Sequence, residues 1–231
     1  IALAQYDKSH PCHKIVNVQD PEWDGFQLPE PWSGDLVNAP VLCIASNPSI
    51  NPKEAYPNKI WSNELIVDFF NNRFSEDNIW TKERRVLLDD GESYETDSVN
   101  FWNGVHLQVE RAFGREVVMG EDYVMTEIVH CKSKKEKGVR ICMKTCAKMW
   151  MEKIIQSSSS RVLILFGVIA RDWFGSFIGD SLGSAGVRFD VSIGGGHRTV
   201  VWLPHPSSGL KRILTEVLDN SDIEKIRRQL R

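Results

Sequence analysis

The 231-residue sequence has no apolar run long enough to span a membrane and no basic-then-apolar segment typical of a secretory leader. It therefore predicts a soluble protein of the cytoplasm. It also has little excess charge, because 31 acidic and 28 basic residues leave a net charge of −3. A chain of this charge does not attract nucleic acid over its whole surface, so a DNA partner would need a local cluster of Lys and Arg.

Cysteine is scarce, and a common nucleotide-binding signature is missing. The five cysteines are odd in number and lie mostly in apolar or helical context, which favours reduced thiols over a disulfide framework. The glycine run at 194–196 lacks the Lys and the Ser or Thr of a P-loop, and no helical pattern follows it. We therefore expect a turn there rather than a phosphate site.

Two apolar stretches end abruptly in polar loops. Residues 41–45 run into a loop that contains Asn47, and residues 199–203 run into a loop that contains His205. Apolar runs of this length are typical of buried strands, and open α/β sheets bind ligands at the carboxyl ends of their strands. We therefore expect Asn47 and His205 to face one pocket.

The rest of the chain alternates between strand and helix patterns. Strands are predicted at 122–131 and 161–167, a hairpin at 187–203, and helices at 62–70, 97–113, 142–156, after 167 and within 207–231. Residues 1–40 predict an extended arm, and residues 75–96 a long loop. This order predicts a single α/β domain over residues 1–231, with a mostly parallel sheet and helices on both faces.

The two polar loops resemble the signature motifs of the uracil-DNA glycosylase superfamily. Ala45-Ser46-Asn47-Pro48-Ser49 is similar to the first motif of its mismatch-specific and single-strand-selective branches, with Ala45 in place of a leading Gly. His205-Pro206-Ser207-Ser208-Gly209-Leu210 is similar to the second motif, with one extra Ser. The resemblance covers roughly residues 29–220 and implies a four-stranded central sheet and a base-flipping DNA glycosylase.

Hydrolysis of an N-glycosidic bond needs a water held against C1′ and a donor for the charge that develops on the departing base. Asn47 suits the first task and His205 the second, so these are the predicted catalytic residues. Tyr56 lies near a segment similar to the family's base-stacking region, and the predicted base-binding residues are Ser46, Tyr56 and Glu127. Each loop alone is also compatible with a plain turn.

Glu127 departs from the family pattern. In the uracil-reading branches the similar segment carries an Asn, whose amide can donate to O4 and accept from N3–H of uracil. An ionised carboxylate only accepts, whereas a protonated carboxyl donates to N3 and accepts from N4–H of cytosine. Glu127 therefore favours a cytosine-type base, preferably a modified phage cytosine. Uracil or another deaminated base is the alternative substrate. The alternative for Glu127 itself is that its side chain points elsewhere or pairs with a lysine and does not read the base.

A basic cluster provides the expected DNA surface. Its members are Lys132, Lys134, Lys135, Lys137, Arg140, Lys144 and Lys148, with Glu136 as the one acid among them. Lys132 and Lys134 directly follow a predicted strand end and are the predicted phosphate contacts. The alternative is a solvated loop and helix face.

The loop after His205 implies a second DNA contact. In the family this loop enters the minor groove and fills the gap left by the flipped nucleotide, and Leu210 suits the wedge. A helix-start residue that packs inward is the alternative for Leu210. The predicted contacts of this loop are Ser207, Ser208, Gly209, Leu210 and Lys211.

No cofactor is predicted. The thermophilic branch carries an iron–sulfur cluster, and Cys131 and Cys146 resemble one pair of its ligands, but the N-terminal region offers only Cys12. A metal site built from Cys12 or His13 with these two cysteines stays an alternative. The hypothesis is a monomeric, monofunctional glycosylase with DNA as its partner. A catalytically silent base-binding module and a nucleotide-binding α/β protein are the rivals.

Overall fold

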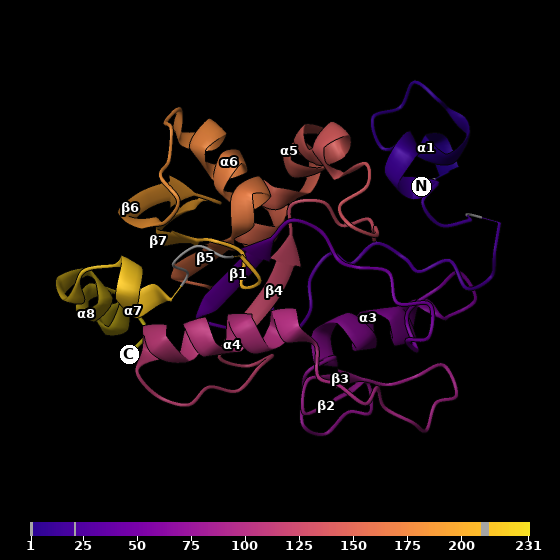
Figure 1. Cartoon of the computed structure of the whole chain (residues 1–231), viewed down its shortest axis with the longest axis horizontal. Coiled ribbons are helices and arrows are strands. Elements are labelled where there is room, and N and C mark those ends of the chain that lie inside the picture. The colour runs from indigo at the N-terminus through magenta and orange to yellow at the C-terminus, as the bar shows by residue number, and fades with distance from the viewer. Residues whose placement is uncertain (1, 21, 209–212) are drawn as a thin grey trace.

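The computed structural model describes residues 2–20, 22–208 and 213–231, and its centre is a five-stranded sheet (Figure 1). The strand order is β4-β1-β5-β7-β6, with β1 Val41–Ala45, β4 Tyr123–Glu127, β5 Val162–Phe166, β6 Gly186–Ile193 and β7 Gly196–Leu203. The first four of these strands run parallel, and β6 is antiparallel to β7. The chain is therefore α/β with a mostly parallel sheet, as predicted, but with five strands rather than four.

The fifth strand comes from the hairpin at the sheet edge. β6 and β7 are joined through Gly194 and Gly195, which both have positive φ. Glycine adopts this conformation without the steric cost of a Cβ. The glycine run is thus the predicted turn, and the hairpin that it closes adds an antiparallel strand to the four parallel ones.

Helices cover both faces of the sheet (Figure 1). They are α1 Ala2–Tyr6, α2 His13–Val16, α3 Asn63–Asn72, α4 Asn100–Phe113, α5 Val139–Ser157, α6 Gly167–Ile178, α7 Leu214–Val217 and α8 Asn220–Gln229. Leu42 and Ile44 of β1 pack into one core with α5 and α6, whereas Val41 and Cys43 pack into another with α4 and α8. This alternation explains why β1 is apolar throughout, because both of its faces are covered.

The first 40 residues are not the extended arm that the sequence predicts. α1 and α2 lie there, on either side of Pro11, and Ile15 and Val16 are buried in the same core as α5, so apolar burial stabilises these short helices. The segment is extended further on, where Ser33 and Met125 exchange backbone hydrogen bonds of 2.8 and 3.0 Å. This pairing places Glu30 beside the end of β4, since its N–H donates to the carbonyl of His130 at 2.9 Å.

The region between β1 and α4 follows the sequence more closely. Ser62 caps α3, with its Oγ accepting from the N–H of Leu65 at 3.2 Å. Residues 75–96 form the predicted long loop, interrupted by the two-residue strands β2 (Thr81–Lys82) and β3 (Arg85–Val86). In the described part of the chain, no helix combines the length and apolarity needed to cross a membrane.

Candidate functional site

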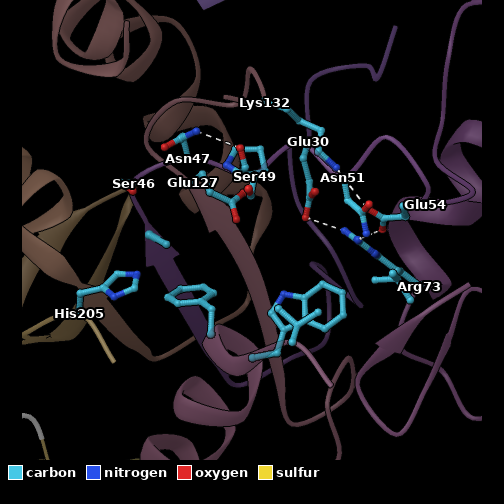
Figure 2. A pocket seen from close by; sticks show the side chains of 16 residues that line it. Glu30, Ser46, Asn47, Ser49, Asn51, Glu54, Arg73, Glu127, Lys132 and His205 are labelled. Atoms are coloured by element: carbon cyan, nitrogen blue, oxygen red, sulfur yellow. Dashed lines mark hydrogen bonds and ion pairs between the residues drawn. The ribbon is translucent and has the colours of Figure 1, made fainter. Parts of the chain in front are cut away.

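A pocket of about 290 Å³ opens at the carboxyl ends of β1 and β4. Five side chains that the sequence singles out line this pocket, namely Ser46, Asn47, Glu127, Lys132 and His205 (Figure 2). They come from the loops after β1, β4 and β7 and from the last residue of β4. The parallel strands thus bring the two polar loops to one sheet edge, as their sequence predicts.

The ring of His205 is held by two neighbours. Its Nδ1 accepts from the N–H of Ser207 at 3.1 Å, and the ring stacks on Phe101 with centroids 5.1 Å apart and planes 20° apart. Because a backbone N–H can only donate, Nδ1 is unprotonated and the neutral ring carries its proton on Nε2. Burial lowers the pKa of His205 below its ordinary 6.5, while Glu136 acts in the opposite direction. His205 can therefore donate a hydrogen bond from Nε2–H in the pocket while its ring is neutral.

Asn47 is fixed by the loop after β1. Its Nδ2 donates to the carbonyl of Pro48 at 2.9 Å. The loop is tied to the segment after β4 by two backbone bonds of 3.0 Å, from Val129 to Ser46 and from Ser133 to Pro48. An amide held through one N–H still has an acceptor oxygen and a second N–H. Asn47 can therefore bind a water without being a nucleophile itself.

Glu127 is a buried carboxyl at the end of β4. It pairs in register with Ala45 of β1 and is 4% exposed. Its Oε2 has no hydrogen-bond partner among the described residues. Burial raises the pKa of Glu127 well above 4.5 and the charge of Glu30 raises it further, whereas Arg73 and Lys132 oppose this. The neutral acid is therefore favoured, and it can donate as well as accept.

Four buried charges, Glu30, Glu54, Arg73 and Lys132, lie across the pocket from His205 and are here termed the buried charge cluster (Figure 2). Nη1 of Arg73 donates to Oε1 of Glu30 at 2.9 Å, and Nη2 pairs with Oε1 of Glu54. Nζ of Lys132 lies 3.4 Å from Oε2 of Glu54. Sequence patterns do not single out the cluster as a unit, because its members come from four segments. The one local signal is an arginine within the aromatic stretch 69–74.

Tyr56 does not line the pocket, contrary to the prediction that it stacks on a base. It is 3% exposed, its hydroxyl donates to Oε2 of Glu30 at 2.9 Å, and its ring packs edge-on against Phe69. A buried hydroxyl needs a partner, and Glu30 holds the ring inside the protein. The aromatic residues that do line the pocket are Phe101 and Trp102 at the start of α4. Their sequence context is that of an ordinary amphipathic helix.

Lys132 is not the surface phosphate contact that the sequence predicts. It is 2% exposed, and its Nζ lies 3.4 Å from the centroid of the Tyr56 ring. The neighbouring Lys134 is exposed, as are Lys135, Lys137, Arg140, Lys144 and Lys148. The basic cluster is therefore a surface feature without Lys132.

The loop after His205 is described only in part. Ser207 is exposed and Ser208 is half-buried, and neither lines the pocket that His205 lines. The predicted contacts Gly209, Leu210 and Lys211 lie outside the described residues. The wedge role of Leu210 stays a prediction.

The cysteines are all free thiols. Cys12, Cys131 and Cys146 line one apolar cavity of about 410 Å³, so three residues of the alternative metal site do come together. Among the described residues, however, no group of three His, Cys, Asp or Glu side chains could hold a metal ion. Nδ1 of His13 instead lies 2.9 Å from a backbone carbonyl. The geometry does not support a metal site.

Comparisons with known proteins assign no family. No model of a known protein family matches the chain. A search of curated protein sequences also finds no significant match. A function for the chain therefore has to be inferred from the chemistry of its pocket.

Proposed function

We propose that this protein is a monofunctional DNA glycosylase, which flips a base out of DNA and hydrolyses its N-glycosidic bond to leave an abasic site. The observation that carries the proposal is the meeting of Asn47, Glu127 and His205 in one pocket. A glycosylase needs a water site, a base reader and a donor to the departing base, and these side chains can supply them. In this proposal the fold is a uracil-DNA glycosylase fold extended by β6, and the protein acts as a cytoplasmic monomer without a cofactor.

Asn47 and His205 divide the hydrolysis between them. The amide of Asn47 holds a water against C1′ of the extruded nucleotide. His205 donates its Nε2–H to O2 of the base, where negative charge develops as the bond breaks. Burial keeps His205 neutral, so it acts as a hydrogen-bond donor rather than as a cation. Both contacts strengthen toward the transition state, so they raise turnover more than affinity.

Phe101 and Trp102 take the stacking role first expected of Tyr56. Both line the pocket, and Phe101 already stacks on the ring of His205. A flipped base leaves its neighbours in the DNA and needs a new π-face, which these rings can provide. We therefore assign base stacking to the start of α4.

Glu127 points to a cytosine-type base. Its neutral carboxyl offers one O–H donor and one acceptor oxygen, which complement N3 and the N4 amino group of cytosine. Uracil presents N3–H and O4, so it would require the opposite order of donor and acceptor. A modified cytosine is the preferred substrate, in which case the enzyme acts against phage DNA; uracil or another deaminated base is the alternative.

Lys132 does not change the mechanism to a covalent one. A bifunctional glycosylase needs an amine that can attack C1′ of the sugar. Nζ of Lys132 is paired with Glu54 and lies over the ring of Tyr56, and Figure 2 shows Lys132 across the pocket from His205. This position supports water attack and a monofunctional enzyme.

The test is release of a base. Purified protein would be incubated with oligonucleotides that contain cytosine, 5-hydroxymethylcytosine or uracil and with phage DNAs that contain modified cytosine, and abasic sites would be revealed by alkali. We expect cleavage of a cytosine-type substrate by the wild type and none by the double variant Asn47→Ala/His205→Ala. Binding without base release on every substrate would support the base-binding module, and absence of DNA binding would support a nucleotide-binding protein.

A further inference from the structure

Five ionisable side chains meet within the pocket wall, namely the buried charge cluster and Glu127. None of them is more than 8% exposed. They come from the N-terminal segment, the loop after β1, the end of α3, the end of β4 and the loop after β4. Two further titratable groups touch them: the phenol of Tyr56, hydrogen-bonded to Glu30 at 2.9 Å, and His130, whose ring interacts with Glu30 and with the backbone of Glu127 and whose pKa burial lowers to about 4, so that it is neutral at pH 7. The protonation of any one member therefore depends on all the others.

The contacts divide the three carboxyls into two kinds. Glu30 accepts from Arg73 at 2.9 Å, from Ser33 at 2.8 Å and from the Tyr56 hydroxyl at 2.9 Å. Glu54 pairs with Arg73 and Lys132. Glu127, by contrast, has an Oε2 without a partner among the described residues. Two carboxylates thus hold both cations, and the third carboxyl is left outside the pairing.

The net charge of the buried charge cluster explains why Glu127 stays outside this pairing. Arg73 and Lys132 contribute two positive charges, and ionised Glu30 and Glu54 contribute two negative ones, so the buried charge cluster sums to zero. Ionising Glu127 would leave one uncompensated negative charge in a buried site, which is strongly unfavourable. Taking up a proton avoids that cost. The same count identifies which substitutions would move the proton.

We propose that Glu54 and Lys132 are positioning residues that fix the protonation of Glu127 and, through it, the hydrogen-bond pattern that the pocket presents to a base. Removing the charge of Glu54 leaves two cations facing Glu30 alone, so Glu127 gives up its proton and becomes their second anion. An ionised Glu127 can only accept, and the cytosine-type donor is lost. Removing Lys132 as well restores the balance, because Arg73 and Glu30 then pair and Glu127 is neutral again. The consequence for base choice rests on the proposed function, whereas the consequence for the proton does not.

The proton can be observed directly by infrared spectroscopy of the free protein, because a protonated carboxyl has a carbonyl stretch that a carboxylate lacks. The Glu127 band is identified as the one that Glu127→Gln removes. We expect this band at pH 7 in the wild type, its loss in Glu54→Gln, and its return in Glu54→Gln/Lys132→Met. The matched control is Glu152→Gln, an exposed glutamate on α5, which leaves the band in place.

Three outcomes would overturn the proposal: no band in the wild type that Glu127→Gln removes, a band that persists in Glu54→Gln, or a double variant in which it stays absent. Near-ultraviolet circular dichroism establishes that each variant is folded. If the double variant does not fold, the result for Glu54→Gln alone still decides, because a purely structural role for Glu54 would not ionise Glu127.

A second measurement connects the proton to base choice. With an oligonucleotide that carries a cytosine-type base, we expect Glu54→Gln to weaken discrimination from uracil by about 10- to 100-fold, the range for a bidentate base contact. The double variant should recover most of it. If the infrared bands behave as expected but no variant or wild type releases any base, the glycosylase proposal fails and the charge balance stands. If base release occurs but the bands do not change, the charge balance fails and the glycosylase proposal stands.

Discussion

The two walls of the pocket are built in different ways. Asn47 and His205 stand on loops that directly follow strands, and each is held by a backbone group one or two residues away. The buried charge cluster is assembled from four distant segments and is held by ion pairs away from water. A local wall can lose a side chain without losing its shape, whereas a wall of paired charges cannot lose one charge without exposing another. Substitutions of Asn47 or His205 should therefore lower turnover with little effect on stability, whereas removing one charge of the buried charge cluster should lower stability.

The largest effect is expected in the second wall. Arg73→Met removes the cation that pairs with Glu30 and one of the two cations that pair with Glu54, so the free energy of unfolding should fall by about 3–5 kcal/mol, as for other broken buried ion pairs. Urea denaturation would measure it. The matched control is Arg188→Met, because Arg188 pairs with Asp180 at 2.8 Å with both side chains nearly half exposed, and such pairs contribute at most about 1 kcal/mol. Equal losses in the two variants would contradict the contrast between the walls.

In the first wall the loss should be catalytic. His205→Ala is expected to lower turnover by about 100- to 1000-fold, the range for removing one donor to developing charge. Asn47→Ala should also lower turnover steeply, because the attacking water is no longer held against C1′. DNA affinity and the free energy of unfolding should change little. Single-turnover base release gives the rate, and His197→Ala, which changes an exposed histidine, is the control. Unchanged turnover in either variant would remove that residue from the mechanism.

Glu127 belongs to both walls, since it ends β4 and also faces the buried charge cluster. In the proposed function the neutral carboxyl of Glu127 lies against N3 and can pass its proton to N3 as cytosine departs. Glu127→Gln keeps a carbonyl and an N–H donor but has no such proton, so it should bind the cytosine-type substrate and cleave it about 100-fold more slowly. Glu127→Asn should shift preference toward uracil. Competition assays with paired oligonucleotides would measure both. Efficient excision of plain uracil by the wild type and by both variants would show that Glu127 does not read the base.

Stability should also depend on pH through Glu127. Its pKa in the folded protein is raised above 4.5 by burial, so the folded state holds a proton that the unfolded state releases. Wild-type stability therefore falls as pH rises from the unfolded pKa toward the folded one, by up to about 1.4 kcal/mol per pH unit. Glu127→Gln lacks this contribution. The free energy of unfolding of Glu127→Gln should therefore increase relative to that of the wild type as the pH rises from 5 to 7. A difference between the two proteins that does not change with pH would show that Glu127 is ionised in the folded protein.

The smallest expected effect is on the salt dependence of DNA binding, which should differ between the exposed lysines that follow β4 and the buried Lys132. Replacing Lys134, Lys135 and Lys137 together by Gln should weaken DNA binding similarly across sequences and reduce its salt dependence by about one unit of slope for each phosphate that the protein no longer neutralises. Lys132→Met should leave the slope unchanged, because Lys132 is buried. Fluorescence anisotropy at several salt concentrations would measure both. A slope that changes only with Lys132 would reverse the assignment.

Lys132 and Lys134 also show where prediction from sequence stops. Both lysines follow the same predicted strand, and both carry the positive charge that a phosphate contact needs, but only Lys134 is exposed. Tyr56 shows the same limit, because its position near a familiar motif predicted a base contact and a hydrogen bond to Glu30 holds it in the interior. Periodicity describes one element at a time. It does not show which side chains are covered by segments that are distant in the sequence.

The sequence by itself determined the apolar strands of the parallel sheet and the two polar loops, after β1 and after β7, that follow their carboxyl ends. Continuous apolar runs require burial on both faces, and burial of parallel strands brings Asn47, Glu127 and His205 to one edge. Only the tertiary structure decided what surrounds Glu127. Glu30 and Arg73 reach it from separate parts of the chain, and in a buried site the charges of all neighbours together set the protonation of each one. That sum exists only once the segments have packed together.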